Sequence, residues 1–418
     1  MFNIHIKSIS WLFFEKVLRA ASGILITAMV ARYLGPSHFG FLSVAIGTIA
    51  VFSASVSMGA DHINVSELSK RQDLDALKFL SSAVLIRFLW SSFSLLCIFL
   101  YIEFTQEENV EVYFILATLI PLAAFSIFGN KLQSDGAFKQ YSLLNIAIIF
   151  FAAISRIAGV HFSLALEFFA LVAVFEGILA SIFFAVWIFK NNKYDFKYLY
   201  PSWENMKSYF LLCLPTAASA VLVTLYLRLE IFMVKYQMGN ASAGLWAAVV
   251  MFITPWGMVA ASILPVANRY LSKGDMEGVG YEKKLVLLIR FMMIVSFIFV
   301  LLTCVASAFL VPVLFGESYL KIIEAIWIAS IVIIPLFMGS VQEIWIAQQQ
   351  NTGVVIKKVL VGLPVSAVLL FWFIEAWGLY GAAVAMVMSY VLTAIILNYM
   401  FDKKFLKLQI HAVGIKYE

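Results

Sequence analysis

Long apolar segments, separated by short polar ones, follow one another along almost the whole chain. A membrane-spanning helix needs about 20 mostly apolar residues, and reading for that length predicts about twelve such helices. We expect them near residues 9–30, 41–60, 79–101, 112–129, 142–160, 164–189, 209–236, 244–266, 285–311, 320–343, 354–374 and 378–400. Several of the polar gaps are only a few residues long, so neighbouring helices should form tight hairpins. The pattern therefore predicts an all-α polytopic membrane protein.

The chain also carries an internal echo with a constant offset of 204 residues, close to half of its 418. The residues that recur are Met29, Val30, Gly35 and Gly40, repeated as Met233, Val234, Gly239 and Gly244. A Leu-Ser-Lys tripeptide follows each copy, at residues 68–70 and 271–273. Internal duplication in a very apolar chain is typical of transporters. We expect a six-helix bundle at 1–190, a cytoplasmic linker at 191–208, a second six-helix bundle at 209–402 and a basic cytoplasmic tail at 403–418.

The distribution of Lys and Arg predicts how the chain is oriented in the membrane. If the N-terminus is cytoplasmic, 20 cations lie in cytoplasmic segments and only Arg32, Lys235 and Lys321 lie on the opposite side. Such an excess marks the cytoplasmic side of a membrane protein. The two copies of the echo then have the same orientation, which makes them parallel repeats related by an axis along the membrane normal. Both termini are expected in the cytoplasm.

The composition excludes several classes of protein. Hydrophobic residues make up 63% of the chain and charged residues 13%, against about 25% charged in a soluble domain. The net charge of +5 follows from the topology, so no nucleic-acid partner is expected. The three cysteines lie inside apolar segments without metal-ligand spacing, which predicts neither disulfides nor a metal site. We find no nucleotide-binding or catalytic motif and no long outer loop, so neither an enzyme nor a bound cofactor is predicted.

The first predicted helix carries charges that a lipid-facing helix would avoid. A charge at mid-bilayer costs at least ~2.5–3.5 kcal/mol on insertion scales, so it usually faces a bundle interior or a watery cavity. Glu15 and Arg19 are four residues apart and can pair on one face, and Gly23 and Thr27 continue that stripe. Lys16 lies beside it. The stripe is either a packing seam or a cavity wall. We favour the cavity, because three ionisable residues within five positions exceed what packing needs.

The seventh predicted helix resembles the first. Arg228 continues a polar face with Thr224, whereas Glu230, two residues further, points about 200° around the helix. We expect Arg228 to face inward and Glu230 to make a contact within the bundle near the outer surface. For Glu176, near the middle of its segment, a structural pair with Arg156 and a proton-carrying role both remain open.

Two further cations, Arg87 and Arg290, lie within two turns of the cytoplasmic ends of their helices. They could extend to the headgroups or face the interior, and the sequence favours neither. Asp61, at the inner end of the second helix, is a candidate for ion coupling.

The segment Arg32-Tyr33-Leu34-Gly35-Pro36-Ser37-His38-Phe39-Gly40 closely resembles the R-x-L-G-P-x-x-[FY]-G signature of Wzx-type polysaccharide flippases. These belong to the multidrug/oligosaccharidyl-lipid/polysaccharide exporter superfamily. Gly59 and the sequence Leu132-Gln133 with Gly136 and Lys139 also match, although Ser134 stands where the family usually has Gly. The resemblance implies a MATE-like fold over essentially the whole chain. The glycines themselves we interpret as a hairpin corner without ligand contact.

The resemblance implies a flippase that moves an undecaprenyl-pyrophosphate-linked oligosaccharide, an O-antigen or capsule repeat unit, across the bacterial inner membrane by alternating access. Arginine pairs with phosphate through a planar fork of donors. The expected substrate-binding residues are Arg19, Lys16, Arg228 and Arg156, with the two helices of Arg19 and Arg228 facing a central cavity. The candidate ion-coupling residues, for a proton or sodium gradient, are Glu15, Asp61, Glu176 and Glu230.

Two functional alternatives to a flippase differ from it in what they require of the chain. The polymerase and chain-length regulator of the same pathway are expected partners of a flippase. A cation-coupled drug or metabolite exporter of the same superfamily is the first alternative, and an acid-rich cavity would favour it. An O-antigen polymerase is a weaker one, because it generally needs a long outer loop that this chain lacks.

Overall fold

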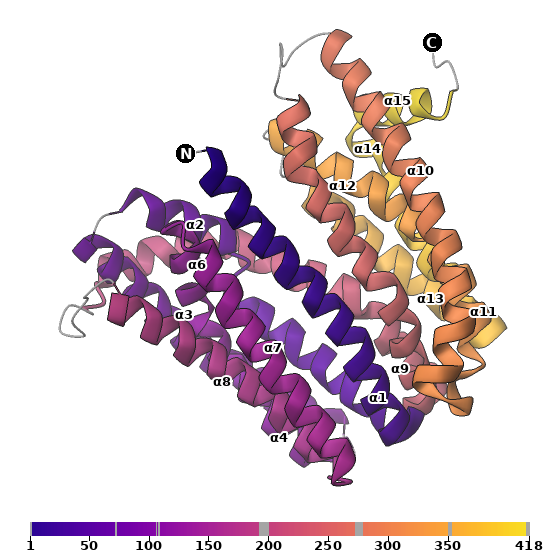
Figure 1. The fold of residues 1–418 in the computed structure, drawn as a ribbon, viewed down its shortest axis with the longest axis horizontal. Coiled ribbons are helices and arrows are strands. Elements are labelled where there is room, and N and C mark those ends of the chain that lie inside the picture. Colours follow the sequence, from indigo (N-terminus) through magenta and orange to yellow (C-terminus); the bar gives the residue numbers. More distant parts are fainter. Residues whose placement is uncertain are drawn as a thin grey trace. The chain divides into compact units, whose positions relative to one another are not determined.

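The computed structural model describes residues 2–71, 73–105, 107, 109–191, 200–271, 279–349 and 353–414, and every regular element in those ranges is a helix (Figure 1). The chain divides into two compact units. Unit 1 comprises Met1–Leu34 and Leu42–Leu227, and unit 2 comprises Gly35–Phe41 and Arg228–Glu418. The division between the units falls inside a long helix at residues 227–228. Most of the predicted linker, residues 192–199, lies outside the described residues, and the two six-helix bundles remain a prediction.

Unit 1 is helical, with an apolar core cluster that includes Leu80, Phe128 and Tyr209. Besides the elements named next, it holds residues 203–227 of the longest helix, whereas residues 35–41 of its first helix belong to unit 2. Its elements are α1 (Phe2–Ser57), α2 (Asp61–Lys70), α3 (Asp73–Thr105), α4 (Val110–Ala117), α5 (Leu119–Leu122), the 3₁₀ turn η1 (Ala123–Ser126), α6 (Ile127–Ser134), α7 (Phe138–His161) and α8 (Leu166–Asn191). The pieces from α4 to α6 form one interrupted span over Val110–Ser134. α7 and α8 pack against each other along their length, and α4 and α6 also pack on α8.

The elements of unit 2 begin within the longest helix. They are α9 (Trp203–Leu271), α10 (Val279–Leu310), the π turn η3 (Val311–Phe315), the 3₁₀ turn η4 (Glu317–Tyr319), α11 (Ile322–Ser330), α12 (Ile333–Gln348), α13 (Gly353–Val391), the π turn η5 (Leu392–Ile396), α14 (Asn398–Phe401) and α15 (Lys403–Ala412). α10 lies beside α11, α12 and α15, and α11 packs on α13. A core cluster that includes Leu285, Ile289 and Phe337 fills the space between these helices.

Nine of the described helical segments are long and apolar enough to cross a membrane. Three of them are 57, 59 and 49 residues long. At 1.5 Å per residue the shortest extends about 74 Å, more than twice the ~30 Å of a bilayer's hydrocarbon core. All three contain a break at a glycine, Gly35, Gly239 or Gly378, and the first has a second break at residues 58–60, between α1 and α2. The structure thus gives nine continuous candidate segments among the described residues, three of them long enough for two spans, and the count of about twelve stays a prediction.

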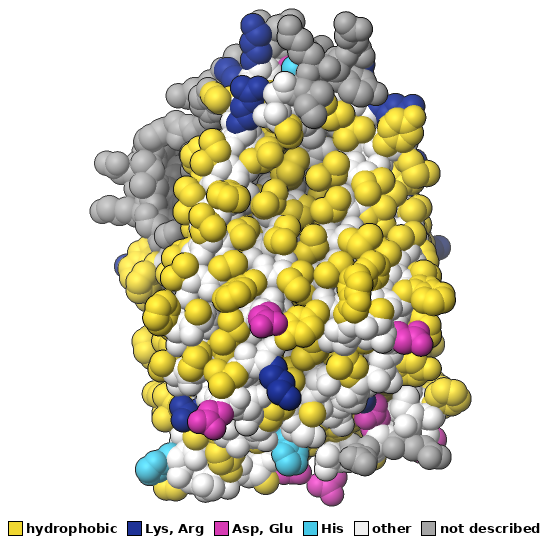
Figure 2. Space-filling model, turned by 90° about the vertical axis from the view of Figure 1, so that its right-hand side faces the viewer, with side chains coloured by type: hydrophobic (Ala, Val, Ile, Leu, Met, Phe, Trp, Pro, Cys, Tyr) yellow, Lys and Arg dark blue, Asp and Glu magenta, His cyan; other side chains and the backbone are white. Residues whose placement is uncertain are grey.

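The surface agrees with a multi-pass membrane protein. Figure 2 shows hydrophobic side chains over most of the face drawn, with only scattered charged side chains across its middle. Large apolar side chains such as Ile294, Phe309 and Trp372 are more than 60% exposed, which water would penalise and lipid would not. The predicted all-α membrane fold is confirmed.

The two copies of the glycine motif share one backbone geometry. Gly35 has φ 70° and ψ 169°, and Gly239 has φ 80° and ψ 179°. Side chains with a Cβ essentially never adopt these angles. The echo seen in the sequence is therefore a corner between two helices that the chain builds twice, 204 residues apart.

The same two motifs meet at a contact without side chains, which we call the glycine crossing (Pro36, Gly40, Asn240 and Gly244, all in unit 2). A Cβ added to Gly40 would lie 1.9 Å from the carbonyl oxygen of Asn240. One added to Gly244 would lie 2.0 Å from the carbonyl oxygen of Pro36. The two contacts are equivalent, because Gly40 corresponds to Gly244 in the repeat and Pro36 corresponds to Asn240. The two backbones therefore touch at the second glycine of each motif.

The described part of the predicted tail is a docked helix. Phe405 and Leu408 of α15 are buried in the core cluster of unit 2, and Phe405 packs on Trp345 with the ring centroids 6.2 Å apart. From α10, the Nε of Arg290 donates to the carbonyl of Ala412 at 2.9 Å, and its Nη2 donates to the carbonyl of His411 at 3.0 Å. Arg290 therefore caps the C-terminus of α15, where a positive charge also complements the helix dipole.

Candidate functional site

Arg19 of α1 is held on one side by a carboxylate from its own helix. Its Nε donates to Glu15 Oε1 at 2.9 Å, and its Nη2 lies 2.8 Å from the same oxygen. The Glu15 side chain is 6% exposed and that of Arg19 is 47% exposed. The predicted pairing across one helical turn is therefore present. The buried carboxylate fixes one edge of the guanidinium and leaves its remaining donors accessible.

A second helix completes the support of Arg19. On α7, the side-chain oxygen of Asn145 accepts from Arg19 Nη2 at 3.3 Å. Tyr141, one turn earlier, lies within interaction range of Asn145, Glu15 and Arg19. Neither α7 residue was identified from the sequence. The available signal was two polar side chains four residues apart in an otherwise apolar segment.

The hairpin of α7 and α8 carries a second ion pair. Arg156 Nη2 contacts Glu176 Oε1, and the two side chains are 28% and 32% exposed. The positive charge of Arg19 also acts on the Glu176 carboxylate, so the two pairs lie within electrostatic range of each other. Of the two interpretations open for Glu176, the structural pair with Arg156 is present.

These side chains form a unit 1 charge cluster (Glu15, Lys16, Arg19, Arg156 and Glu176). Lys16 is exposed and makes no hydrogen bond or ion pair with a described residue. With three cations and two carboxylates, the formal net charge of the cluster is +1 when all are ionised. Partly exposed guanidiniums with free donors are suited to a phosphate-bearing anion, because each can accept a second oxyanion beside the carboxylate that orients it.

Asp61 lies apart from the charge cluster. It is exposed at the start of α2 and accepts a hydrogen bond from Asn130 Nδ2 of α6 at 3.0 Å. It interacts electrostatically with Tyr141. Asp61 therefore joins α2 to α6, and its proposed role in ion coupling rests on no contact with the cluster carboxylates.

The predicted residues of unit 2 have different surroundings. Arg228 of α9 is exposed and forms no hydrogen bond or ion pair with a described residue. Glu230 lies beside the fully buried side chain of Trp246. Glu230 therefore has a contact inside its own unit, and the inward direction expected for Arg228 stays a prediction.

Arg87, whose direction the sequence left open, points inward. Its side chain is fully buried. Nη1 donates to Ser126 Oγ at 3.2 Å, Nη2 donates to the carbonyl of Ser57, and the guanidinium lies 5.6 Å from the centroid of the Tyr209 ring. Ser57 is the last residue of α1, so Arg87 caps that helix end and belongs to the packing of unit 1.

We find no candidate metal site in the part of the chain that the structure describes. No group of three or more His, Cys, Asp or Glu side chains is arranged to hold an ion there.

Two relatives have related sequences. A Shigella flexneri protein described as "Putative O-antigen transporter" is 22% identical over 421 residues, covering 95% of this chain and 98% of that protein. The uncharacterized membrane protein EpsK of Bacillus subtilis (strain 168) is 26% identical over 227 residues, covering 53% of this chain and 44% of that protein.

Two solved structures have the same fold. Lipid II flippase MurJ in an inward closed conformation gives a TM-score of 0.72 at 15% identity, covering 98% of this chain and 91% of that one. An inward-facing multidrug resistance MATE family transporter of the MOP superfamily gives 0.64 at 15% identity, covering 94% and 95%. At these identities the likeness shows the fold alone, and it confirms the MATE-like architecture.

A family model decides the relationship. The model described as polysaccharide biosynthesis protein matches residues 29–324, which is well over half of the chain and includes both copies of the glycine motif. The resemblance to Wzx-type flippases carried by residues 32–40 is thereby confirmed, and the chain belongs to the polysaccharide biosynthesis protein family.

Proposed function

We propose that this protein is a flippase that moves a lipid-linked oligosaccharide from the cytoplasmic to the opposite leaflet. The observation that carries the proposal is the partly exposed guanidinium of Arg19, oriented by Glu15 and Asn145 within a membrane-spanning segment. An intramembrane charge that remains accessible marks a substrate or ion pathway. The family and the Shigella flexneri relative support a role in polysaccharide export.

The proposed ligand is the diphosphate of an undecaprenyl-pyrophosphate-linked repeat unit of O-antigen or capsule. Arg19 offers it the donors that Glu15 leaves free, and Lys16 adds a compact positive charge on the next position of the same helix. Arg156 joins when its pair with Glu176 opens. We assign Arg228 of unit 2 the same chemical role at another stage of an alternating-access cycle.

Coupling to a proton or sodium gradient would act through the cluster carboxylates. Protonating Glu15 removes the charge that holds one edge of Arg19, so the guanidinium gains freedom to bind or release phosphate. Glu176 stands in the same relation to Arg156. Asp61 and Glu230 also remain candidates for ion coupling, although they lie outside the charge cluster.

The proposed setting is the bacterial inner membrane, with both termini in the cytoplasm and a polymerase and chain-length regulator as partners. The excess of Lys and Arg on one side of the predicted topology supports this orientation. Position-specific cysteine labelling at Lys78 and at Lys321 would test it, since impermeant reagents should reach only the second from outside.

The experiment that tests the function is complementation of a deletion strain. Deletion should stop surface polysaccharide and leave lipid-linked units on the cytoplasmic leaflet. Arg19→Ala should fail to restore export although the protein is present in the membrane. Arg19→Lys, which keeps the charge and loses the fork, should restore it only partly. The matched control is Lys321→Ala, an exposed cation at the start of α11, which should restore it fully.

The alternatives predict other outcomes. Single repeat units at the cell surface of the deletion strain would assign the protein as a polymerase. Normal surface polysaccharide combined with increased sensitivity to small cationic compounds would assign it as a drug or metabolite exporter. Full export with Arg19→Ala would contradict the role of the charge cluster.

A further inference from the structure

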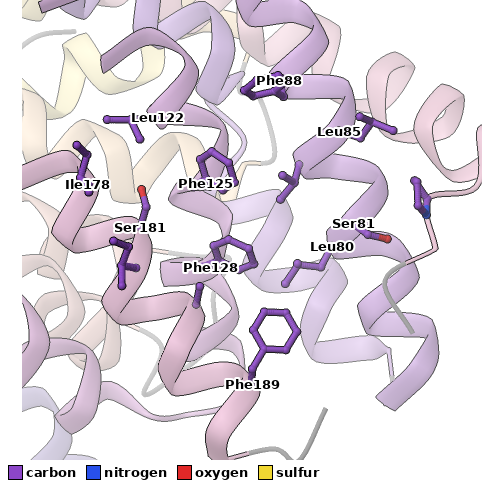
Figure 3. A pocket seen from close by; sticks show the side chains of 14 residues that line it. Leu80, Ser81, Leu85, Phe88, Leu122, Phe125, Phe128, Ile178, Ser181 and Phe189 are labelled. Carbon is purple, nitrogen blue, oxygen red and sulfur yellow. The ribbon is translucent and has the colours of Figure 1, made fainter. Parts of the chain in front are cut away.

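Unit 1 contains an apolar groove of about 680 Å³ between α3, α8 and the run from α5 to α6. In Figure 3 the rings of Phe125 and Phe128 lie between side chains of α8 and side chains of α3. Phe88 and Phe189 line the groove further along these helices. All these helices are within the membrane-spanning segments. We therefore expect most of the groove to face hydrocarbon, with Pro201 lining it outside these segments.

The hydroxyl groups that line the groove already donate hydrogen bonds within the protein. Among its lining side chains only two serines carry a polar group. Ser81 Oγ donates to the carbonyl of Lys78 at 3.1 Å, and Ser181 Oγ donates to the carbonyl of Gly177 at 2.8 Å. With both donors used inside their own helices, the groove selects a hydrocarbon chain and would penalise a polar ligand.

The length of the groove indicates which chain fits. Along α8 it runs from Ile178 to Phe189, which at 1.5 Å per residue is about 16 Å. Half of a bilayer's ~30 Å hydrocarbon core is about 15 Å. The groove therefore accommodates the depth of one leaflet, as an acyl chain does. A polyprenyl chain long enough to cross both leaflets would leave about half of its length outside.

The charges at one end of the groove indicate the headgroup. Lys78 lies one turn before Ser81 on α3, and Lys190 directly follows Phe189 on α8. Both are exposed, and neither pairs with a carboxylate among the described residues. The predicted topology places both on the cytoplasmic side. Lysines at this depth extend to the interface and attract anionic headgroups.

We propose that the groove is a specific site for an anionic phospholipid of the cytoplasmic leaflet. One acyl chain lies on the phenylalanine rings between α3 and α8, and the phosphate lies beside Lys78 and Lys190. Glu176 of the charge cluster precedes Ile178 of the groove by two residues, about 200° around α8. The lipid site and the charge cluster thus use opposite faces of one helix, so a bound lipid braces the helix that carries Glu176.

Native mass spectrometry of the purified full chain tests this proposal, with phosphatidylglycerol and phosphatidylcholine supplied in equal amounts. The wild type should retain one phosphatidylglycerol in preference to phosphatidylcholine. Lys78→Ala and Lys190→Ala should each weaken its retention about fivefold. Ser181→Trp, which fills the groove, should abolish retention. The controls are Lys321→Ala and Leu171→Trp, the latter at an exposed position of α8 that does not line the groove.

Each of the following outcomes would contradict the proposed lipid site. Equal retention of both lipids, or phosphatidylglycerol retention unchanged in the double lysine variant, removes the headgroup contact. Retention unchanged in Ser181→Trp places the lipid elsewhere. Displacement of phosphatidylglycerol by undecaprenyl diphosphate, lost in Ser181→Trp, would make the groove a substrate-tail site. Because the lysine variants lie on the surface and the readout is lipid retention, failure here leaves the flippase assignment untouched, and failure of complementation leaves this site untouched.

Discussion

The two repeats keep the same backbone corner and differ in their charges. Gly35 and Gly239 have nearly the same φ and ψ, and Gly40 and Gly244 meet at the glycine crossing. The arginines in the preceding helices do not correspond in this way. Arg19 precedes its corner glycine by 16 residues and Arg228 by 11, and only Arg19 is bonded to described neighbours.

The glycines are fixed by steric constraints, whereas the positions of the arginines depend on what they bind. At the glycine crossing, a backbone oxygen about 2 Å from a would-be Cβ leaves only glycine at Gly40 and Gly244, and at the corner the positive φ of Gly35 and Gly239 has the same consequence. A charged side chain can move along its helix provided that it still reaches its ligand. The comparison therefore assigns the shared features to architecture and the unshared ones to function, and four sets of variants test that division.

The largest expected effect is at the glycine crossing. Gly40→Ala and Gly244→Ala should each destabilise the protein by at least about 3 kcal/mol, because the new methyl overlaps main chain that cannot turn aside. Thermal unfolding of the purified protein in detergent measures this. Gly23→Ala is the matched control, since no atom lies within 4 Å of its would-be Cβ. Equal stability of all three variants would show that the two motifs do not cross.

The corner glycines should come next, and their two effects should be equal. Gly35→Ala and Gly239→Ala meet no neighbouring atom within 4 Å, so the whole cost is conformational. It should be about 3 kcal/mol for angles that only glycine adopts readily. The same unfolding assay applies. A large loss in one repeat and none in the other would mean that the shared geometry is not a shared requirement.

Removing the arginine of each repeat should change the stability of the protein by different amounts. Arg19→Ala leaves the buried Glu15 carboxylate without its donor and should cost about 2 kcal/mol of stability. Arg228→Ala removes no described bond and should change stability by less than about 0.5 kcal/mol. Adding Glu15→Gln to Arg19→Ala should recover part of the loss. Equal destabilisation by the two arginine variants would contradict the difference between their surroundings.

The smallest effect is expected at Asn145. Asn145→Ala removes one hydrogen bond to Arg19 and should cost about 1 kcal/mol. In a double-mutant cycle, Asn145 should couple to Arg19 and show no coupling to Arg228. Export measured on the same variants separates positioning from packing, because Asn145→Ala should lower export only when Arg19 is present.

Local features of the fold could be predicted from the sequence. The spans follow from apolar length alone, and the Glu15–Arg19 pair follows from a spacing of one helical turn. The repeated corner follows from a constant offset between glycines. Each of these features depends on residues that are close in the chain or on a sequence pattern that occurs twice.

Features that depend on packing between distant helices could not be predicted. Asn145 reaches Arg19 across 126 residues, and nothing in α1 indicates which helix lies against it. The directions of Arg87 and Arg290 were open because depth in the membrane does not tell which helix end lies nearby. Both turned out to cap one, Arg87 at the end of α1 and Arg290 at the end of α15. The apolar groove has no sequence signature, since its lining resembles any lipid-facing surface.

The glycine crossing also bears on the ancestry of the fold. A polypeptide carrying a single repeat could form the same junction with a second copy of itself, each glycine facing its twin. Gene duplication and fusion would then convert a homodimer contact into an internal one without altering an atom at the junction. Under this scheme the two copies would be free to acquire different charges after fusion, while the close contact of Gly40 and Gly244 would keep the junction unchanged.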